Sequence, residues 1–246
     1  MNNRLAAIIS SFCLLFCFTI CSGQPAADTV ENRAVVNNTI NNFNHAIGQQ
    51  SWLYNGANYE LSRKLIKGSP NFMDTLVADT GWVVYYGYKY KRVPLLYNIY
   101  EDLLISTRPD GFNRYSFTSD RLTEFSLLGH HFIRLDPDSV TSRVIKPGFY
   151  DNLYTNKLQV LVKRTKSTLK VNGLLSVDDY YIPKMYYYLQ KDGRYYSVSG
   201  EGAFLDVLKD HKKELKKYLK DNKIKFRRQP EEAMVMLAKY YDQLTN

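Results

Sequence analysis

Alternating hydrophobic and polar residues predict β-strands over most of the chain after residue 50. The densest stretch, residues 81–106, reads GWVVYYGYKYKRVPLLYNIYEDLLIS, and its tyrosine, valine and leucine side chains pack well on a pleated sheet. We expect this stretch to form the middle of an antiparallel sheet. Within it, strands at residues 82–86 and 88–93 should flank Gly87 as a tight hairpin.

Pro94 should mark an edge or a break in this sheet, because proline cannot donate to a ladder. A third strand is expected over residues 96–106. Four Asx-Gly pairs predict hairpins, since they tolerate the positive φ of a type I′ turn: Asn55-Gly56, Asp110-Gly111, Asn172-Gly173 and Asp192-Gly193. The remaining strands are predicted at residues 114–117, 122–127, 131–135, 149–154, 158–166, 180–189 and 194–198.

The hydrophobic period becomes helical near both ends of the chain. Residues 28–48 predict a short helix whose apolar face holds Val36, Ile40, Phe43 and Ile47. A C-terminal helix with Ser199 as its N-cap should break near Asp210. Its buried stripe is predicted to be Phe204, Leu208, Leu215 and Leu219. A last helix should begin near Pro230 and bury Ala233, Leu237, Tyr240 and Leu244.

These elements predict an α+β fold, mainly an antiparallel β-meander with hairpins and a C-terminal helical segment. Composition and turn signals divide the chain into a leader (1–23), an N-terminal helix or linker (24–50), a first β-block (51–138), and a second β-block with the C-terminal helices (139–246). Alternatively, residues 24–246 form one compact domain, since 223 residues are enough for a sizeable core.

The first 23 residues have the pattern of a secretory signal peptide: one basic residue, an uncharged apolar run and then small residues. Cleavage after Gly23 is expected, and lipidation of Cys21 is the alternative. All three cysteines, Cys13, Cys17 and Cys21, lie in this leader. The mature protein would therefore hold no disulfide and no thiolate chemistry. We expect an exported protein of the periplasm or cell surface, with no transmembrane segment after the leader.

Two surfaces are candidate contact sites. Residues 209–228 carry ten basic and three acidic side chains, a net charge of +7 in a chain with 33 basic and 24 acidic residues. Lys212, Lys213, Lys216, Lys217 and Lys220 could contact an anionic envelope component or a partner protein. A solvated helix face is the alternative, and export argues against nucleic acid. Tyr186, Tyr187 and Tyr188 must place rings on both faces of their strand, so one face would pack inward while the other could form an aromatic platform.

No pattern of catalytic, cofactor-binding or metal-binding residues stands out. His130 and His131 are adjacent on a predicted strand and should point to opposite faces, which prevents them from chelating one metal. The acidic pairs 101–102, 178–179 and 231–232 could serve a hydrolase only if two carboxylates converge across a cleft. No GxSxG or Walker motif is present.

Several stretches resemble a family of uncharacterised exported proteins from Bacteroidota, with no assigned activity. The resemblance rests on GSPNF at 68–72, the region from Val93 to Asp102, GFYD at 148–151, and most strongly the tail from KDGRYYSVSG at 191 to YYDQL at 240–244. It implies export in a Gram-negative host. We expect a non-catalytic binding or envelope-associated structural module. The alternative is a hydrolase of an envelope or extracellular polymer with an unidentified carboxylate site.

Overall fold

The computed structural model describes residues 35–36, 38–39, 42–43, 52–60, 65–137, 143–172 and 177–245. The leader, most of the expected helix at 28–48 and the turn residue Gly173 lie outside the described residues. The chain forms two compact units, Met1–Thr39 and Ile40–Asn246, and the sheet and the C-terminal helices belong to the second unit.

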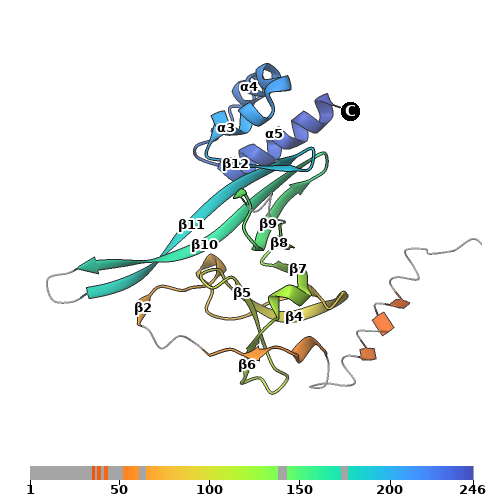
Figure 1. Ribbon diagram of the computed structural model, residues 1–246, viewed down its shortest axis with the longest axis vertical. Helices are drawn as coiled ribbons and strands as arrows, with labels where there is room; N and C mark the ends of the chain where they lie inside the picture. Colours follow the sequence, from red (N-terminus) through yellow and green to blue (C-terminus); the bar gives the residue numbers. More distant parts are fainter. Residues whose placement is uncertain are drawn as a thin grey trace, which may run out of the picture. The chain divides into compact units, whose positions relative to one another are not determined.

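One sheet of twelve strands organises this unit (Figure 1). Its order is β1-β6-β5-β4-β3-β7-β8-β9-β10-β11-β12, with every pair along this path antiparallel, while β2 pairs in parallel with β11. The strands are β1 Ala57–Asn58, β2 Ile66–Lys67, β3 Asp79–Tyr85, β4 Tyr88–Asn98, β5 Leu103–Thr107, β6 Arg114–Ser116, β7 Leu122–Leu127, β8 His130–Leu135, β9 Gly148–Thr155, β10 Leu158–Asn172, β11 Val177–Lys191 and β12 Arg194–Val198. The predicted α+β class with antiparallel hairpins is confirmed.

The stretch at 81–106 lies inside the sheet as predicted, because β3, β4 and β5 each have a neighbour on both sides. β4 runs through Pro94 without ending, so the strand does not break there. The predicted edge is confirmed locally, because Pro94 pairs with β3 alone and β5 joins β4 only from Leu95 onward. Arg92 has a positive φ of 55° and is an extra residue between Val93 and Lys91 in the register with β3. The bulge and the one-sided pairing together accommodate the proline in this strand.

The expected third strand at 96–106 was wrong. The chain reverses at residues 99–102, where Asp102 has a φ of 58°, and β5 pairs back onto the end of β4. Asn98 holds this turn, since its side-chain oxygen accepts the backbone N–H groups of Tyr100 and Glu101, each at 3.0 Å. The sequence NIYED carries no glycine, which explains why the turn was missed.

The tight hairpins have glycine in the second turn position. In each of these turns the first central residue has a φ of 51–52° and the glycine a φ of 73–78°, as a type I′ turn requires. The three pairs are Tyr86-Gly87, Leu128-Gly129 and Asp192-Gly193. Asn55-Gly56 was wrongly predicted as a hairpin: it follows the 3₁₀ helix η2 (Trp52–Tyr54) and leads into β1, which pairs with the distant β6. Asp110-Gly111 lies in a wider loop between β5 and β6.

The C-terminal segment forms α3 (Glu201–Val207), the 3₁₀ turn η6 (Lys209–His211), α4 (Lys212–Asp221) and α5 (Pro230–Leu244). The break near Asp210 is confirmed, as is burial of the stripe Phe204, Leu208, Leu215 and Leu219. Ser199 was wrong as the N-cap of α3, because Gly200 occupies that position without a side-chain cap. On α5, Ala233 and Leu237 are buried as expected, but Tyr240 and Leu244 are only half-buried. None of the described helices has the length and apolarity needed to cross a membrane.

Three hydrophobic cores lie along the described part of the sheet, and the smallest consists of Ile145, Tyr150 and Leu161. The first is aromatic and packs Tyr97 against Phe125, Phe132 and Phe149, with ring centroids 5.0–6.1 Å apart. The second joins the helices to β10, β11 and β12 through side chains such as Leu158, Leu189 and Leu237. In Figure 1 the helices accordingly lie beside the end of the β10–β11 hairpin that carries β12.

Alkaline pH should destabilise the protein through its buried tyrosines. Burial, partly offset by a hydrogen bond from the Lys146 backbone, raises the pKa of Tyr150 to about 12, from about 10 in an unfolded chain. The contribution of this neutral phenol is complete below pH ~10 and is lost as the pH rises toward ~12. Unfolding midpoints in urea between pH 9 and 12 should therefore fall. Tyr150→Phe should reduce the slope, and Tyr88→Phe, at an exposed ring, is the control; equal slopes in both variants would contradict the assignment.

Candidate functional site

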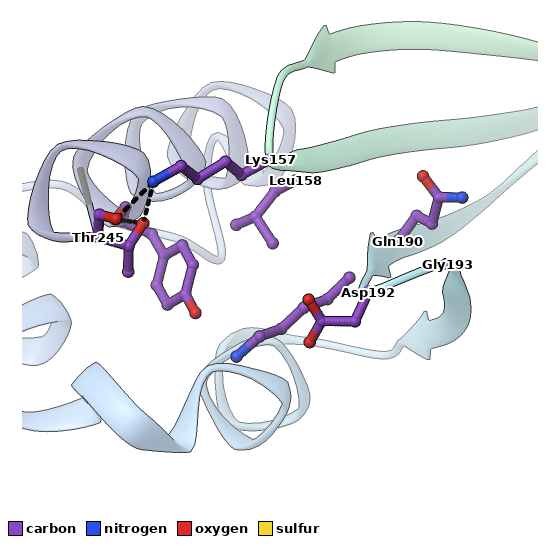
Figure 2. Close-up of a pocket in the computed structure, with 8 residues that line it drawn as sticks. Lys157, Leu158, Gln190, Asp192, Gly193 and Thr245 are labelled. Carbon is purple, nitrogen blue, oxygen red and sulfur yellow. Dashed lines mark hydrogen bonds between the residues drawn. The ribbon is translucent and has the colours of Figure 1, made fainter.

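A cavity of about 460 Å³ lies where the β9–β10 and β11–β12 turns meet the end of α5 (Figure 2). It is lined by Lys157, Leu158, Gln190, Lys191, Asp192, Gly193, Tyr241 and Thr245. Lys157 Nζ donates to the backbone oxygen of Thr245 at 2.5 Å, and Lys191 forms an ion pair with Asp210 at 3.1 Å. Asp192 is the one carboxylate among these lining residues. The cavity therefore lacks the pair of carboxylates that a glycosidase needs.

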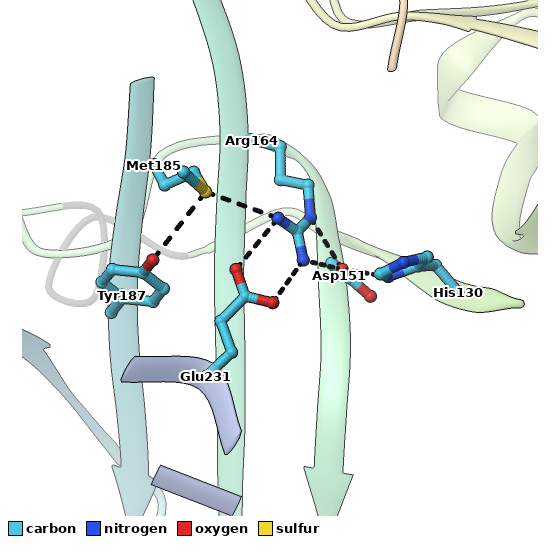
Figure 3. Close-up of polar contacts among 6 residues, drawn as sticks. All are labelled: His130, Asp151, Arg164, Met185, Tyr187 and Glu231. Atoms are coloured by element: carbon cyan, nitrogen blue, oxygen red, sulfur yellow. Dashed lines mark hydrogen bonds and ion pairs between the residues drawn. The ribbon is translucent and has the colours of Figure 1, made fainter. Parts of the chain in front are cut away.

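A buried ion cluster joins β9, β10 and α5 (Figure 3). The Arg164 guanidinium donates through Nε to Asp151 Oδ2 at 2.8 Å. It also donates through Nη1 and Nη2 to both carboxylate oxygens of Glu231, at 3.0 and 2.8 Å. The side chain of Asp151 is 1% exposed and its Oδ2 is also 2.7 Å from His130 Nδ1. We call these four residues the Arg164 cluster.

The electrostatics of the Arg164 cluster are those of a structural ion pair. Burial lowers the pKa of Arg164, but the bonds with Glu231 and Asp151 outweigh it and raise that pKa overall. Both carboxylates are occupied by one guanidinium, which fixes α5 against the middle of β10. Both carboxylates face the same guanidinium and not an open cleft between them, so the cluster gives no support to the hydrolase alternative.

A second ion pair joins Lys163, the residue before Arg164 on β10, to Asp102 in the β4–β5 turn. Lys163 Nζ donates to Asp102 Oδ2 at 2.6 Å and to the Phe149 carbonyl at 3.1 Å, while the Tyr97 hydroxyl donates to Asp102 Oδ1 at 2.5 Å. Burial lowers the pKa of Lys163, and Asp102 opposes that shift. Gly148 has a φ of +135°, and a Cβ there would overlap both charged groups. The contact thus requires glycine at the start of β9.

A third cation of β10, Lys166, fastens the loop before β3. Its Nζ donates to the carbonyls of Ser69 and Asn71, at 2.6 and 2.9 Å, and to Asp74 Oδ1 at 2.5 Å. The Lys166 side chain is 4% exposed. The loop it holds includes the 3₁₀ turn η3 (Phe72–Asp74), in which both Met73 and Asp74 adopt positive φ.

The distal half of the β10–β11 hairpin exposes an apolar face. Leu169 pairs with Tyr180, Ser167 with Ile182, and Lys163 with Tyr186, so these side chains share one face of the hairpin. Four of the large apolar or aromatic residues on this face are exposed: Leu169 (53%), Val171 (46%), Ile182 (37%) and Tyr186 (48%). We call Leu169, Val171, Tyr180, Ile182 and Tyr186 the hairpin stripe. Lys166 and its loop lie on the opposite face, since alternate residues point to opposite sides.

The three candidate tyrosines separate as the strand period predicts. Tyr187 packs against the helical core. Tyr188 packs beside Tyr150 on the other face, with ring centroids 5.7 Å apart, and Tyr186 is exposed on that same face. The structure therefore does not place the three rings together: Tyr186 joins the hairpin stripe, and the other two belong mainly to cores.

The candidate lysines mostly lie on one surface of the helical segment. Burial of Leu215 and Leu219 turns Lys213, Lys216, Lys217 and Lys220 outward, within an arc of about 100° by the helical period. Lys212 differs, because it forms an ion pair with Asp206. Exposed cations continue into the α4–α5 connection, and we call the whole set the basic cap: Lys213, Lys216, Lys217, Lys220, Lys223, Lys225, Arg227 and Arg228. No described carboxylate forms a salt bridge with any of these eight.

His130 and His131 engage different partners: His130 contacts Asp151, whereas His131 Nε2 is 2.7 Å from Glu124 Oε2. Across the described ranges, no group of three or more His, Cys, Asp or Glu residues is arranged to hold a metal ion.

Sequence reasoning missed the three buried cations of β10. Their partners come from segments 13–97 residues away, so the pairing could not be read from local spacing. A signal was present nonetheless: Lys163, Arg164 and Lys166 interrupt an apolar strand, and β10 contains four basic residues but no acid. Buried cations need carboxylates or carbonyls, which marks such a strand as a crossing point of distant segments.

Comparison of the chain with protein-family models, with curated proteins and with solved structures gave no match.

Proposed function

We propose that the protein is an exported, non-catalytic module that attaches through its basic cap to an anionic, phosphate-bearing surface of the bacterial envelope. The observation that carries this proposal is the eight exposed cations of the basic cap, which form no salt bridge with a described carboxylate. The apolar side of α4 is already buried in the core. The exposed side of α4 can therefore attract an anionic surface electrostatically, but it has no hydrophobic face that could insert into a membrane.

The expected strength of such attachment follows from charge. A lysine or arginine near an anionic lipid surface contributes roughly 1 kcal/mol, and the effect decays within a Debye length of about 8 Å. The four α4 lysines of the cap lie within one helical arc and can approach a flat surface together. Attachment should therefore be reversible and strongly salt-dependent.

Export supports this role. The leader predicts secretion with cleavage after Gly23, and the resemblance to exported proteins of Bacteroidota points to a Gram-negative periplasm or cell surface. Lipopolysaccharide and anionic phospholipids are the phosphate-bearing surfaces of that compartment. A hydrolase role is not favoured by any particular observation, because the cavity in Figure 2 is lined by one carboxylate and the Arg164 cluster occupies two more.

Replacing Lys213, Lys216, Lys217 and Lys220 with glutamine should weaken binding to anionic vesicles by up to about 1,000-fold, since each lysine contributes roughly 1 kcal/mol. The measurement is co-sedimentation of the mature protein with vesicles of phosphatidylglycerol and phosphatidylcholine, with lipopolysaccharide-doped vesicles as a second arm to distinguish the two phosphate sources. Binding should weaken steeply between 50 and 300 mM salt, as for exposed charges in general.

The matched control removes four other exposed lysines: Lys91, Lys146, Lys170 and Lys184. It carries the same net charge as the cap variant, so it should lose at most about threefold if the cap is the contact surface. Equal loss in both variants would show that total charge, and not the cap, governs binding. Binding to neutral vesicles as tight as to anionic vesicles would overturn the proposal.

A further inference from the structure

We propose that the free edge of β10 binds an extended, acidic segment of a partner protein, which adds to the sheet as a strand beside residues 163–172. This surface is separate from the basic cap and does not depend on the envelope attachment proposed above. In such β-augmentation, backbone hydrogen bonds supply affinity and alternate side chains supply specificity.

The edge is long and available. β9 pairs with β10 only up to the partners Val162 and Asp151, whereas β10 continues to Asn172 alongside β11. Within the described part of the chain, residues 163–172 therefore pair on one side only. A strand with one unpaired side presents a row of backbone donors and acceptors ready to pair with another chain.

The usual protection of an edge strand is not in place here. Lysine side chains commonly guard an edge by projecting charge over it. Lys163 and Arg164, however, are 12 and 11% exposed and bound to Asp102 and to Asp151 with Glu231, and Lys166 is bound to the loop before β3. These three cations are directed into the protein body, which leaves Lys170 as the exposed cation of this edge.

Charge favours an acidic partner over a second copy of this chain. Lys170 is the exposed cation of β10, and β10 holds no acid, so a second β10 edge would offer Lys170 a like charge and no carboxylate. Lys170 on the edge strand and Lys184 on β11 are exposed and have no described ion-pair partner. Acidic residues in an added strand could pair with both of them.

The hairpin stripe provides an apolar surface against which side chains of the added strand can pack. A strand beside β10 would place every second side chain, about 6.6–7 Å apart, on the face that holds Leu169 and Val171. Tyr180 and Ile182 lie one strand further across the same face. Lys170 lies on the face opposite to Leu169 and Val171, whereas Lys184 pairs with Thr165 and lies on the stripe face. The partner segment should therefore alternate apolar residues with polar ones, with an acidic residue at a polar position near Lys170 and another at the end of the apolar face, near Lys184.

The test is selection from a yeast-displayed library of random ten-residue peptides, sorted with the folded mature protein and followed by fluorescence anisotropy of the best peptide. We expect enriched peptides to alternate apolar and polar residues and to be acidic. Leu169→Thr with Val171→Thr should weaken binding about tenfold. The control, Leu76→Thr with Val77→Thr, changes the same residue types at exposed positions elsewhere and should leave binding within twofold.

Hydrogen exchange then separates strand addition from contact with the face alone. On peptide binding, roughly every second amide of residues 163–172 should exchange more slowly, because alternate N–H groups of an edge point outward. Circular dichroism of the threonine variants checks that both remain folded. Lys170→Gln with Lys184→Gln offers a second, milder variant and should weaken binding by about threefold to tenfold in a salt-dependent way.

Three results would overturn the proposal. One is a library that yields no binder, or binders without the alternating acidic pattern. Another is a binder whose presence leaves the exchange of residues 163–172 unchanged. The third is a concentration-dependent dimer in sedimentation that protects these same amides without peptide, which would assign the edge to a second copy of the chain.

Discussion

Replacing Arg164 with methionine should lower the free energy of unfolding by about 3–5 kcal/mol. The change leaves the Asp151 carboxylate, with a side chain 1% exposed, without its guanidinium, and it releases Glu231 at the start of α5. Breaking a buried pair on one side is costly because the remaining carboxylate loses its cation and keeps His130 Nδ1, at 2.7 Å, as its described side-chain partner. Urea denaturation followed by circular dichroism measures the loss.

A second set of variants distinguishes the ion cluster from simple packing. Arg164→Met combined with Asp151→Asn and Glu231→Gln should recover part of the loss, since no charge is then left buried. Asp120→Asn is the surface control: Asp120 also bonds an arginine, Arg134 at 2.7 Å, but its side chain is 80% exposed, so the change should cost less than about 1 kcal/mol. If Arg164→Met and Asp120→Asn lower the free energy of unfolding by the same amount, the Arg164 cluster does not stabilise the fold more than a surface ion pair does.

Local sequence patterns predicted those parts of the fold that local forces determine. β7 and β12 have the predicted bounds, and the hairpin at Asp192-Gly193 follows from two residues that tolerate positive φ. The prediction failed where a turn uses other chemistry: Asn98 closes the β4–β5 turn with its side chain. It held in part at Pro94, where the strand continues but pairs on one side only, and it missed the bulge at Arg92 that shifts the register.

The candidate surfaces were predictable to different degrees. The basic cap follows from a charge run at helical spacing, so four of the five named lysines are exposed together. The hairpin stripe could not be predicted in the same way, because β10 and β11 were expected to be shorter, at 158–166 and 180–189. The segment 167–172 reads STLKVN, which is too polar to stand out as a strand. It is extended because it pairs with β11 residue by residue as far as Val177.

The Arg164 cluster and the Lys166 contacts show why the two halves of the hairpin differ. Near the helices, β10 is covered by α5 and β9. Arg164 bonds a carboxylate of each, Glu231 on α5 and Asp151 on β9. Further out, Lys166 holds the loop at 69–74 on one face, while the hairpin stripe on the other face remains exposed. The binding surface that we infer thus begins where α5, β9 and the loop at 69–74 stop covering the hairpin. Because that point is set by contacts between residues far apart in the sequence, no local sequence pattern could predict it.

Lys166→Met should lower the free energy of unfolding by about 2–5 kcal/mol. Methionine fills similar space but leaves the carbonyls of Ser69 and Asn71 without their donor, and an unsatisfied buried acceptor costs about 1–3 kcal/mol. Both residues are buried, at 4 and 5% exposure, so water cannot readily replace the ammonium group. Urea denaturation gives the total, and hydrogen exchange shows whether residues 68–75 open first.

The loop itself explains why this one ammonium group has such an effect. Met73 and Asp74 both adopt positive φ, at 52° and 55°, which costs energy for residues other than glycine. The contacts of Lys166 offset that strain, so their removal should release the loop as well as lower stability. Lys170→Met is the matched control, because Lys170 is exposed four residues along the same strand and should change stability by no more than about 0.5 kcal/mol. Equal stability of the two methionine variants, or unchanged exchange at 68–75 in Lys166→Met, would show that the lysine does not hold the loop.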